Sequence, residues 1–367
     1  MNIAYRFRIY PTEEQKILLG KTFGCCRFLY NQMLNDKIQE YEKTKKMLKN
    51  TPAMYKREYP FLKEVDSLAL ANVQLHLEKA YKNFFRDPKI GFPKFKSKHH
   101  SRNSYTTNVV NGNILVESKR IRLPKLKWIA MKKHREPAKG LRLKSVTVSM
   151  EPSGKYFASL LYEGDSCENQ AAELDYSTAK ILGIDYAMQG MAVFSEEIEM
   201  EEAGFFRKNE KRLVREQRKL SRCVRGSHNY ELQKKKVARC HEKIRNQRRD
   251  YLHKLSRKIV DSYDAVAVED IDMKAMGQCL HFGKSVHDNG YGMFREMLDY
   301  KLAWKGKKIV KVDRFFPSSK KCCKCGRIKK ELKLSERVYH CVCGNEMDRD
   351  RNAAINIREE ARRMLIA

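Results

Sequence analysis

Ala265-Val266-Ala267-Val268-Glu269 is an apolar run that ends in a carboxylate, and with Ile181-Leu182-Gly183-Ile184-Asp185 it decides the fold of the second half of the chain. Short apolar runs of this kind are typical of strands buried on both faces. Longer segments with helical periodicity lie between and after them. Strands that alternate with helices predict an α/β domain. We therefore expect a sheet in which the strands at 180–184 and 265–268 are each followed by an acid.

The other elements of this half follow from the same periodicities. Strands are predicted at 191–195 and 308–312. Between them, Glu196–Glu202 is an acidic patch without a Gly or Pro turn signal. Helices are predicted at Phe206–Arg222, Tyr230–Asp261, Tyr291–Trp304 and Asn352–Arg363.

Three acids stand where this fold could bring them together. Asp185 and Glu269 end strands, and Asp350 opens the last predicted helix. Carboxylates in such positions can converge on two Mg²⁺ ions, typically ~4 Å apart, that promote phosphodiester hydrolysis, and Mn²⁺ is an alternative ion. We therefore predict that these three acids are catalytic and bind the metal. Lower-ranked acids are Asp264, Asp270, Asp272, Asp313 and Asp348, the last interpreted as a helix cap.

Five of the 11 cysteines cluster between residues 322 and 343. Cys322-x-x-Cys325 and Cys341-x-Cys343 form two knuckles, each followed by a glycine. Four thiolates in this layout fit one tetrahedral Zn²⁺ with no open position, which indicates a structural site. Cys323 lies inside the first knuckle and is interpreted as a bystander. The scattered cysteines, interpreted as packing residues, are Cys25, Cys26, Cys167, Cys223, Cys240 and Cys279.

The charge of the chain indicates a polyanionic partner. Lys and Arg number 76 against 45 Asp and Glu, a formal net charge of +31 that is spread from Arg6 to Arg363. Such a field favours nucleic acid. No run approaches the ~18 apolar residues of a membrane span, and the N-terminus lacks a signal-peptide pattern. We expect no membrane partner and a cytoplasmic, nucleoid-associated protein. The sequence contains no P-loop motif, so we do not expect ATP hydrolysis.

The first half of the chain reads as strands with inserted helices. Residues 3–9 alternate in a strand that points Arg6 and Arg8 outward. Thr12 to Gln15 has capping-box spacing, so a helix should begin there and run towards residue 45. Another helix is expected at 67–85. Strand signals return from Ile114 to Tyr162, with a hairpin around Pro152-Ser153-Gly154. We expect one β-barrel from residues 1–10 and about 105–178, with a helical domain at 11–104 inserted.

Two basic segments are candidate nucleic-acid surfaces. Gly91–Lys98 alternates aromatic and basic residues, which suits stacking on bases and pairing with phosphates. The alternative is a rigid loop whose aromatic rings fill the core. In the helix predicted at 206–222, basic residues recur at helical spacing, and we interpret them as nucleic-acid contacts. The alternative is a charged face that is only solvated. The candidate contacts are Arg6, Arg8, Lys94, Lys96, Lys98, Tyr105, Arg207, Lys211, Arg215, Arg218 and Arg222.

These motifs resemble a known family, TnpB, the compact RNA-guided nucleases of bacterial insertion sequences that are related to type V CRISPR effectors. The opening Tyr5–Thr12 is similar to the family's first strand, and the resemblance extends over essentially the whole chain. The segments that carry it are Gly183–Met188, Val268–Asp270, Arg314–Gly326 and Cys343–Ala354. One departure is the acidic segment after Ser195, where many relatives have a Gly-containing hairpin turn.

The resemblance implies an α+β multidomain fold. A wedge β-barrel (1–10 and 105–178) would hold an inserted helical recognition domain (11–104). A RuvC-like nuclease of RNase H fold (179–318 and 347–367) would hold an inserted zinc ribbon (319–346). It also implies a guide RNA, called omega RNA, with one protein per RNA. The RNA would pair with double-stranded target DNA while the protein reads a short flanking motif.

The family implies that Asp185, Glu269 and Asp350 are the Mg²⁺-binding catalytic acids of an RNA-guided DNA endonuclease. All three are present. Two other functions stay open from the sequence. One is an RNA-guided repressor that binds DNA without cleaving it. The other is a transposase that joins DNA strands directly.

Overall fold

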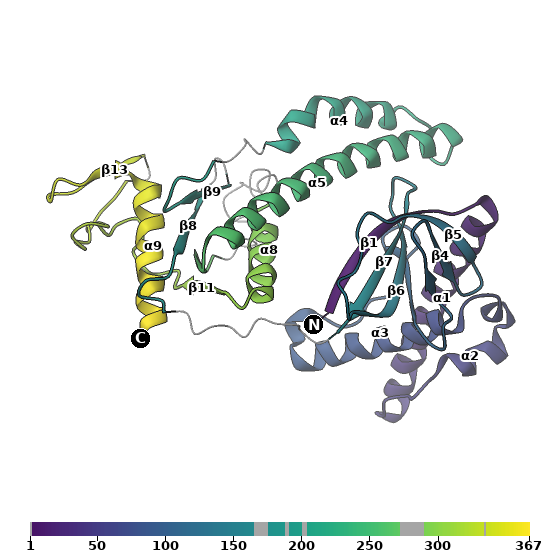
Figure 1. Ribbon diagram of the computed structural model, residues 1–367. Helices are drawn as coiled ribbons and strands as arrows, with labels where there is room; N and C mark the ends of the chain where they lie inside the picture. The colour runs from purple at the N-terminus through teal and green to yellow at the C-terminus, as the bar shows by residue number, and fades with distance from the viewer. Residues whose placement is uncertain (1, 165–174, 188–190, 200–203, 272–289, 334) are drawn as a thin grey trace. The chain divides into compact units, whose positions relative to one another are not determined.

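The computed structural model describes residues 2–164, 175–187, 191–199, 204–271, 290–333 and 335–367. Two compact units divide at Cys167 and Glu168 (Figure 1). Asp272, Cys167, Cys279 and residues 200–202 of the acidic segment, all considered above, lie outside the described residues. No helix in the described part of the chain is both long and apolar enough to cross a bilayer.

The first unit is built on a seven-stranded sheet of order β2-β6-β7-β1-β5-β4-β3. The strand that opens the chain lies inside this sheet, antiparallel to β5 and β7. The predicted hairpin is present as β6 and β7. No pairing among the described strands joins β2 to β3, so the strand pairing shows a sheet with two ends and not the closed barrel expected from the sequence. The strands are β1 (Asn2–Tyr10), β2 (Asn103–Asn108), β3 (Leu115–Val116), β4 (Arg120–Leu123), β5 (Lys127–Lys132), β6 (Arg142–Met150) and β7 (Tyr156–Glu163).

Helices between β1 and β2 share one core with this sheet. The predicted capping box is present, because the Thr12 side chain accepts from the Gln15 N–H and the Gln15 side chain accepts from the Thr12 N–H. The Asp66 side chain caps the third helix by accepting from the Leu68 N–H. The helices are α1 (Glu13–Thr44), α2 (Pro52–Glu58) and α3 (Ser67–Arg86), with 3₁₀ turns η1 (Pro60–Glu64) and η2 (Pro88–Ile90).

The second unit is a three-layer α/β structure around a four-stranded sheet of order β11-β10-β8-β9. Strands β8, β10 and β11 are parallel, and β9 is antiparallel to β8. One face packs on α5 and α8 and the other on α9; Figure 1 shows α9 lying across β8. The elements are β8 (Ile181–Ala187), β9 (Met191–Phe194), α4 (Phe205–Ser221), α5 (His228–Ser262), β10 (Ala265–Glu269), α8 (Tyr291–Trp304), β11 (Lys308–Val312) and α9 (Arg349–Ile366).

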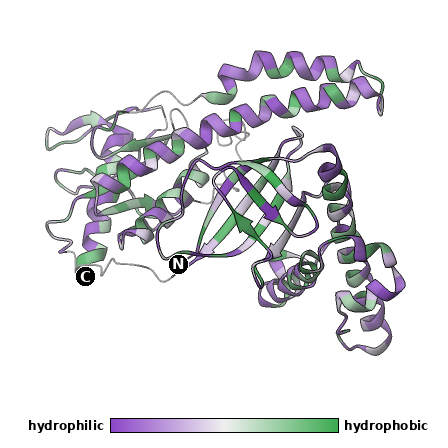
Figure 2. Cartoon of the chain, turned by 45° about the vertical axis from the view of Figure 1, so that its right-hand side comes forward, coloured by the Kyte–Doolittle hydropathy of each residue, from purple (hydrophilic) through white to green (hydrophobic). Residues whose placement is uncertain are grey.

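Helices α4 and α5 pair as a long hairpin with a narrow apolar seam. Leu213, Cys240 and Ile244 are its buried residues, and most other positions are hydrophilic (Figure 2). So small an apolar stripe suits helices that present most of their surface to solvent or to a charged partner.

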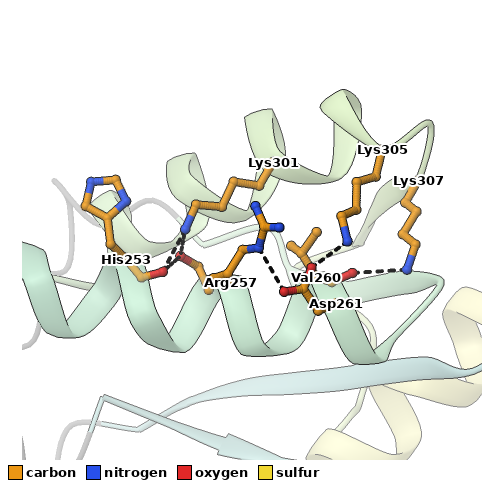
Figure 3. A network of polar contacts seen from close by, with 8 residues as sticks. His253, Arg257, Val260, Asp261, Lys301, Lys305 and Lys307 are labelled. Atoms are coloured by element: carbon orange, nitrogen blue, oxygen red, sulfur yellow. Dashed lines mark hydrogen bonds and ion pairs between the residues drawn. The ribbon is translucent and has the colours of Figure 1, made fainter. Parts of the chain in front are cut away.

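Three lysines of α8 and the following turn hold the C-terminal part of α5 (Figure 3). The Lys301 ammonium, which is buried, donates to the His253 carbonyl and the Ser256 hydroxyl. Lys305 binds Asp261. Lys307 donates to the carbonyls of Val260 (3.0 Å) and Tyr263 (2.6 Å), which lie at the end of the helix. A cation here complements the partial negative charge of a helix C-terminus, and two carbonyls at the end of α5 have a hydrogen-bond partner.

Candidate functional site

Strand register brings Asp185 and Glu269 together. Ile184 on β8 is opposite Val268 on β10, so the next residue of each parallel strand is one of the two acids. Ile184 and Val268 belong to the core under α5 and α8. Because successive side chains alternate in a strand, the two acids point to the opposite face, which α9 covers. One expectation needs correction: β8 continues to Ala187, so Asp185 lies inside the strand and not at its end.

Helix α9 brings the third acid to this face. Asp348 is the N-cap and accepts from the Arg351 N–H at 2.9 Å, as its sequence position predicts, and Asp350 lies in the first turn. A Cβ on Gly183 would lie 2.0 Å from the Ala354 carbonyl oxygen. Only glycine therefore allows α9 to cross β8 so closely, two residues before Asp185.

Asp185 is influenced electrostatically by the other two acids. Burial and, to a smaller extent, the nearby charges of Glu269 and Asp350 raise the pKa of Asp185 to about 8, against a lowering by Arg349. Burial also raises the pKa of Glu269. Carboxylates from these three positions are a suitable donor set for a hard divalent cation, which would relieve the repulsion that Asp185 experiences.

Two arginines that the sequence did not single out pair with Asp350. The Nε and Nη2 of Arg349 each donate to Asp350 Oδ1 at 3.2 Å, and Arg337 Nη1 lies 3.9 Å from Oδ2. Within the described residues, the donor atoms of the four cysteines all lie within 4.8 Å of one another. The donor atoms of the three acids are not all that close. Arg349 is adjacent to Asp350 in the sequence, but nothing in the sequence indicates Arg337.

The lower-ranked acids have local roles. Asp264 lies at the other end of β10, where it accepts from the Lys180 N–H at 3.1 Å. Asp270 lies 3.8 Å from Arg295. Asp313 accepts from the Phe315 N–H at 2.7 Å. Each of these three acids therefore has a local partner, and the ranking of Glu269 above its neighbours stays a prediction.

The four predicted cysteines form a cluster whose spacing fits a metal ion. The Sγ atoms of Cys322, Cys325, Cys341 and Cys343 all lie within 4.8 Å of one another. The Cys322–Cys343 and Cys325–Cys341 pairs are separated by 3.7 and 3.6 Å. Four sulfur donors at these spacings fit tetrahedral Zn²⁺.

Knuckle turns position these thiols. The N–H groups of Gly326 and Gly344 donate to the carbonyls of Cys322 and Cys341, each at 2.9 Å, and both glycines have positive φ. The second knuckle lies at the turn of a hairpin formed by β12 (Val338–His340) and β13 (Glu346–Asp348).

The other cysteines that the structure describes lie outside this cluster. Burial raises the pKa of the Cys323 thiol, which contacts Met347 and Asn345. The predicted packing role holds for Cys25, Cys26 and Cys240, which are buried, whereas Cys223 is only half-buried.

The nucleic-acid candidates of the first unit divide by exposure. Arg8 is exposed on β1, but Arg6 pairs with Glu151 and lies over the Phe157 ring. The prediction that Tyr105 contacts nucleic acid is wrong. This residue is 5% exposed and packs near Phe23 in the core, so its ring is not available to a ligand.

The loop from Gly91 to Lys98 combines both interpretations of its sequence. Lys94 and Lys98 are exposed, while Lys96 is half-buried with its ammonium 3.8 Å from the centre of the Tyr30 ring. Phe95 is 56% exposed. Phe92 leaves 44% exposed but packs against Tyr81 and Phe84. The loop is therefore anchored on one side and free to contact a ligand on the other.

The basic residues predicted on α4 share one face. Those five side chains are exposed and line a shallow hollow, together with Glu210, Val214 and Lys219. Glu210 is the one acid among the described residues that line this hollow, against six basic residues, so its field favours an anion. The five residues are Arg207, Lys211, Arg215, Arg218 and Arg222.

Comparison with known proteins places the chain among relatives of similar length. The relative from Streptomyces pristinaespiralis, named as an RNA-guided DNA endonuclease, is 33% identical, with 96% of this chain and 88% of that protein covered. InsQ of Escherichia coli (strain K12), which carries the same description, is 30% identical, with 96% and 91% covered. The chain belongs to the TnpB family.

Family models agree with this membership. They are described as a probable transposase of the OrfB IS605 type (residues 165–279), a Cas12f1-like TNB domain (291–357) and a helix-turn-helix domain (1–46). In the last range the structure has one strand and one long helix, β1 and α1, and not two helices joined by a turn. A solved Cas12f1–sgRNA–target DNA complex shares the fold, with a TM-score of 0.59 at 14% identity over 98% of each chain. The TnpB resemblance inferred from the motifs is confirmed.

Proposed function

We propose that this TnpB chain is an RNA-guided DNA endonuclease of a transposable element and that Asp185, Glu269 and Asp350 form its catalytic site. The observation that carries the proposal is their convergence on one face of the sheet from β8, β10 and the first turn of α9. The names of its relatives support the guide RNA and the DNA target as partners. Reading of a short flanking motif, one chain per RNA, a nucleoid-associated location and the domain boundaries given above belong to the same proposal.

Each acid has a definable part in phosphodiester hydrolysis. The reaction adds water at phosphorus, breaks the bond to the 3′ oxygen and needs compensation of the negative charge that develops there. Two Mg²⁺ ions, or Mn²⁺, would supply that charge stabilisation when bound. Asp185 and Glu269 would hold them from the rigid sheet, and Asp350 from the helix. Arg349 and Arg337 neutralise Asp350 in the structure.

The test is cleavage of guide-matched DNA by protein purified with the RNA expressed from its own flanking DNA. Asp185→Ala, Glu269→Ala and Asp350→Ala should each abolish cleavage while guided DNA binding persists. Asp313→Ala is the control, since Asp313 makes a local turn contact. Cleavage by Asp185→Ala at the wild-type rate would contradict the site. Tight guided binding without cleavage by the wild type would favour the repressor, and strand-transfer products without RNA would favour the transposase.

A further inference from the structure

Two buried asparagines of α9 fasten this helix to the chain segment that enters the first zinc knuckle. Asn352 has no exposed surface, and its Oδ1 accepts from the Cys323 N–H at 3.0 Å while its Nδ2 donates to the Lys321 carbonyl at 2.7 Å. Asn356, 3% exposed, donates to the carbonyls of Ser318 and Lys321 at 2.8 and 2.6 Å.

Asn352 differs from Asn356 in what it spans. Its two backbone partners, Lys321 and Cys323, are the neighbours of Cys322 in the sequence. The Asn352 amide therefore contacts the backbone on both sides of a predicted zinc ligand. It also lies two residues after Asp350. Asn356 lies a further turn along the helix and does not contact the knuckle N–H groups among the described residues.

The ribbon holds the start of α9 from a second side as well. Strand β13 runs directly into the helix, and the Arg349 N–H donates to the Arg337 carbonyl at 2.8 Å. The first turn of a helix is its least constrained part, because its N–H groups lack partners within the helix. Here that turn carries Asp350, and the start of the helix is held by contacts to the first knuckle and to Arg337, which precedes β12.

We propose that Asn352 is a positioning residue through which the zinc cluster sets the place of Asp350 for binding a divalent cation, an inference that rests on the proposed function of the three acids. Zinc fixes Cys322, the backbone on either side of Cys322 fixes the Asn352 amide, and that amide fixes the helix turn that holds Asp350. Metal ligands must be held within about 0.5 Å of their working geometry, and outer contacts of this kind provide the constraint.

The experiment measures Mn²⁺ binding to the zinc-loaded full-length chain by electron paramagnetic resonance. Asp350→Ala identifies the fraction of binding that belongs to the three acids. Asn352→Ala should weaken that fraction by about 10- to 100-fold, the range typical of lost outer-shell contacts. Asn356→Ala is the matched control, because it also removes two buried hydrogen bonds, one of them to the same Lys321 carbonyl, and it should leave Mn²⁺ affinity close to that of the wild type.

Removal of zinc gives a second measurement, and its wild-type arm does not depend on how well Asn352→Ala folds. Stripping zinc from the wild type should weaken Mn²⁺ binding as the substitution does, and stripping it from Asn352→Ala should add little, because the two changes break one connection. Equal losses in Asn352→Ala and Asn356→Ala, or no loss in Asn352→Ala, would overturn the inference and leave the proposed function standing. Identical Mn²⁺ binding by wild type and Asp350→Ala would instead remove the metal site itself.

Discussion

The carbonyl oxygen of Ala354 lies 2.0 Å from the position that a Cβ on residue 183 would take, so α9 can cross at this distance only because residue 183 is Gly183. The contact joins the strand that carries Asp185 to the helix that carries Asp350. A displacement of α9 at this crossing therefore moves one acid of the proposed site relative to another.

We expect Gly183→Ala to destabilise the second unit by about 1–3 kcal/mol, the usual cost of overpacking. The added methyl would also meet the Arg358 side chain and backbone, 2.9 Å away, so the helix must shift. Thermal unfolding measures the loss, and guided cleavage should fall with it. Gly292→Ala is the control, since a Cβ there meets no described atom within 4 Å. Equal stability of the two variants would contradict the close crossing.

The stability of the metal-free protein should depend on pH through Asp185. Its folded-state pKa, about 8, lies above the ordinary carboxyl value of 3.8, so the folded state retains a proton that the unfolded state releases. Stability is therefore lost as pH rises from about 4 to about 8. In EDTA, Asp185→Asn should raise the Tm clearly at pH 9 and little at pH 4. A difference that does not change with pH would argue against a buried, charge-crowded carboxyl.

The zinc cluster predicts a simple metal analysis. Protein purified without chelator should contain about one Zn²⁺ per chain. Cys325→Ser should lose it, because one of four donors is gone, whereas Cys323→Ser should retain it, because that thiol contacts Met347 and Asn345 instead. Absence of zinc from the wild type, or its loss from Cys323→Ser, would require a different ligand set.

Sequence patterns predicted local features of this fold better than long-range ones. The helix at Tyr291–Trp304 and the strand at Lys308–Val312 have the bounds expected from periodicity. Burial on one face produces a regular spacing of apolar residues that are close in the sequence, and this spacing can be recognised without the structure. The four thiols were also predictable, since knuckle spacing is short-range. The contact of Arg337 with Asp350 was not, because it depends on how the ribbon hairpin folds back. Tyr105 was misplaced for the same reason: its core partners come from distant segments.

The lysine contacts at the end of α5 should matter for stability. Lys307→Met keeps the aliphatic stem but removes two charge-assisted hydrogen bonds to the carbonyls of Val260 and Tyr263, at an expected cost of about 1–3 kcal/mol. Lys311→Met on the neighbouring strand β11 is the control, because Lys311 is exposed. Denaturant unfolding of both variants gives the comparison. Similar free energies of unfolding would mean that water satisfies the α5 carbonyls as well as Lys307 does.

The basic face of α4 can be separated from a merely solvated one by salt dependence. A side chain that pairs with a phosphate releases counterions on binding, so Lys211→Ala or Arg218→Ala should weaken binding and lower the slope of log K against log salt by about 1. Arg212→Ala removes the same charge from an exposed position of α4 outside the hollow, and should change the slope less. The measurement is made on guide RNA and then on target DNA with the RNA-loaded protein, since either of these nucleic acids could occupy this face. If all three variants behave alike with both ligands, the arginines and lysines of the hollow act only through net charge, and the strand path must be sought on another surface.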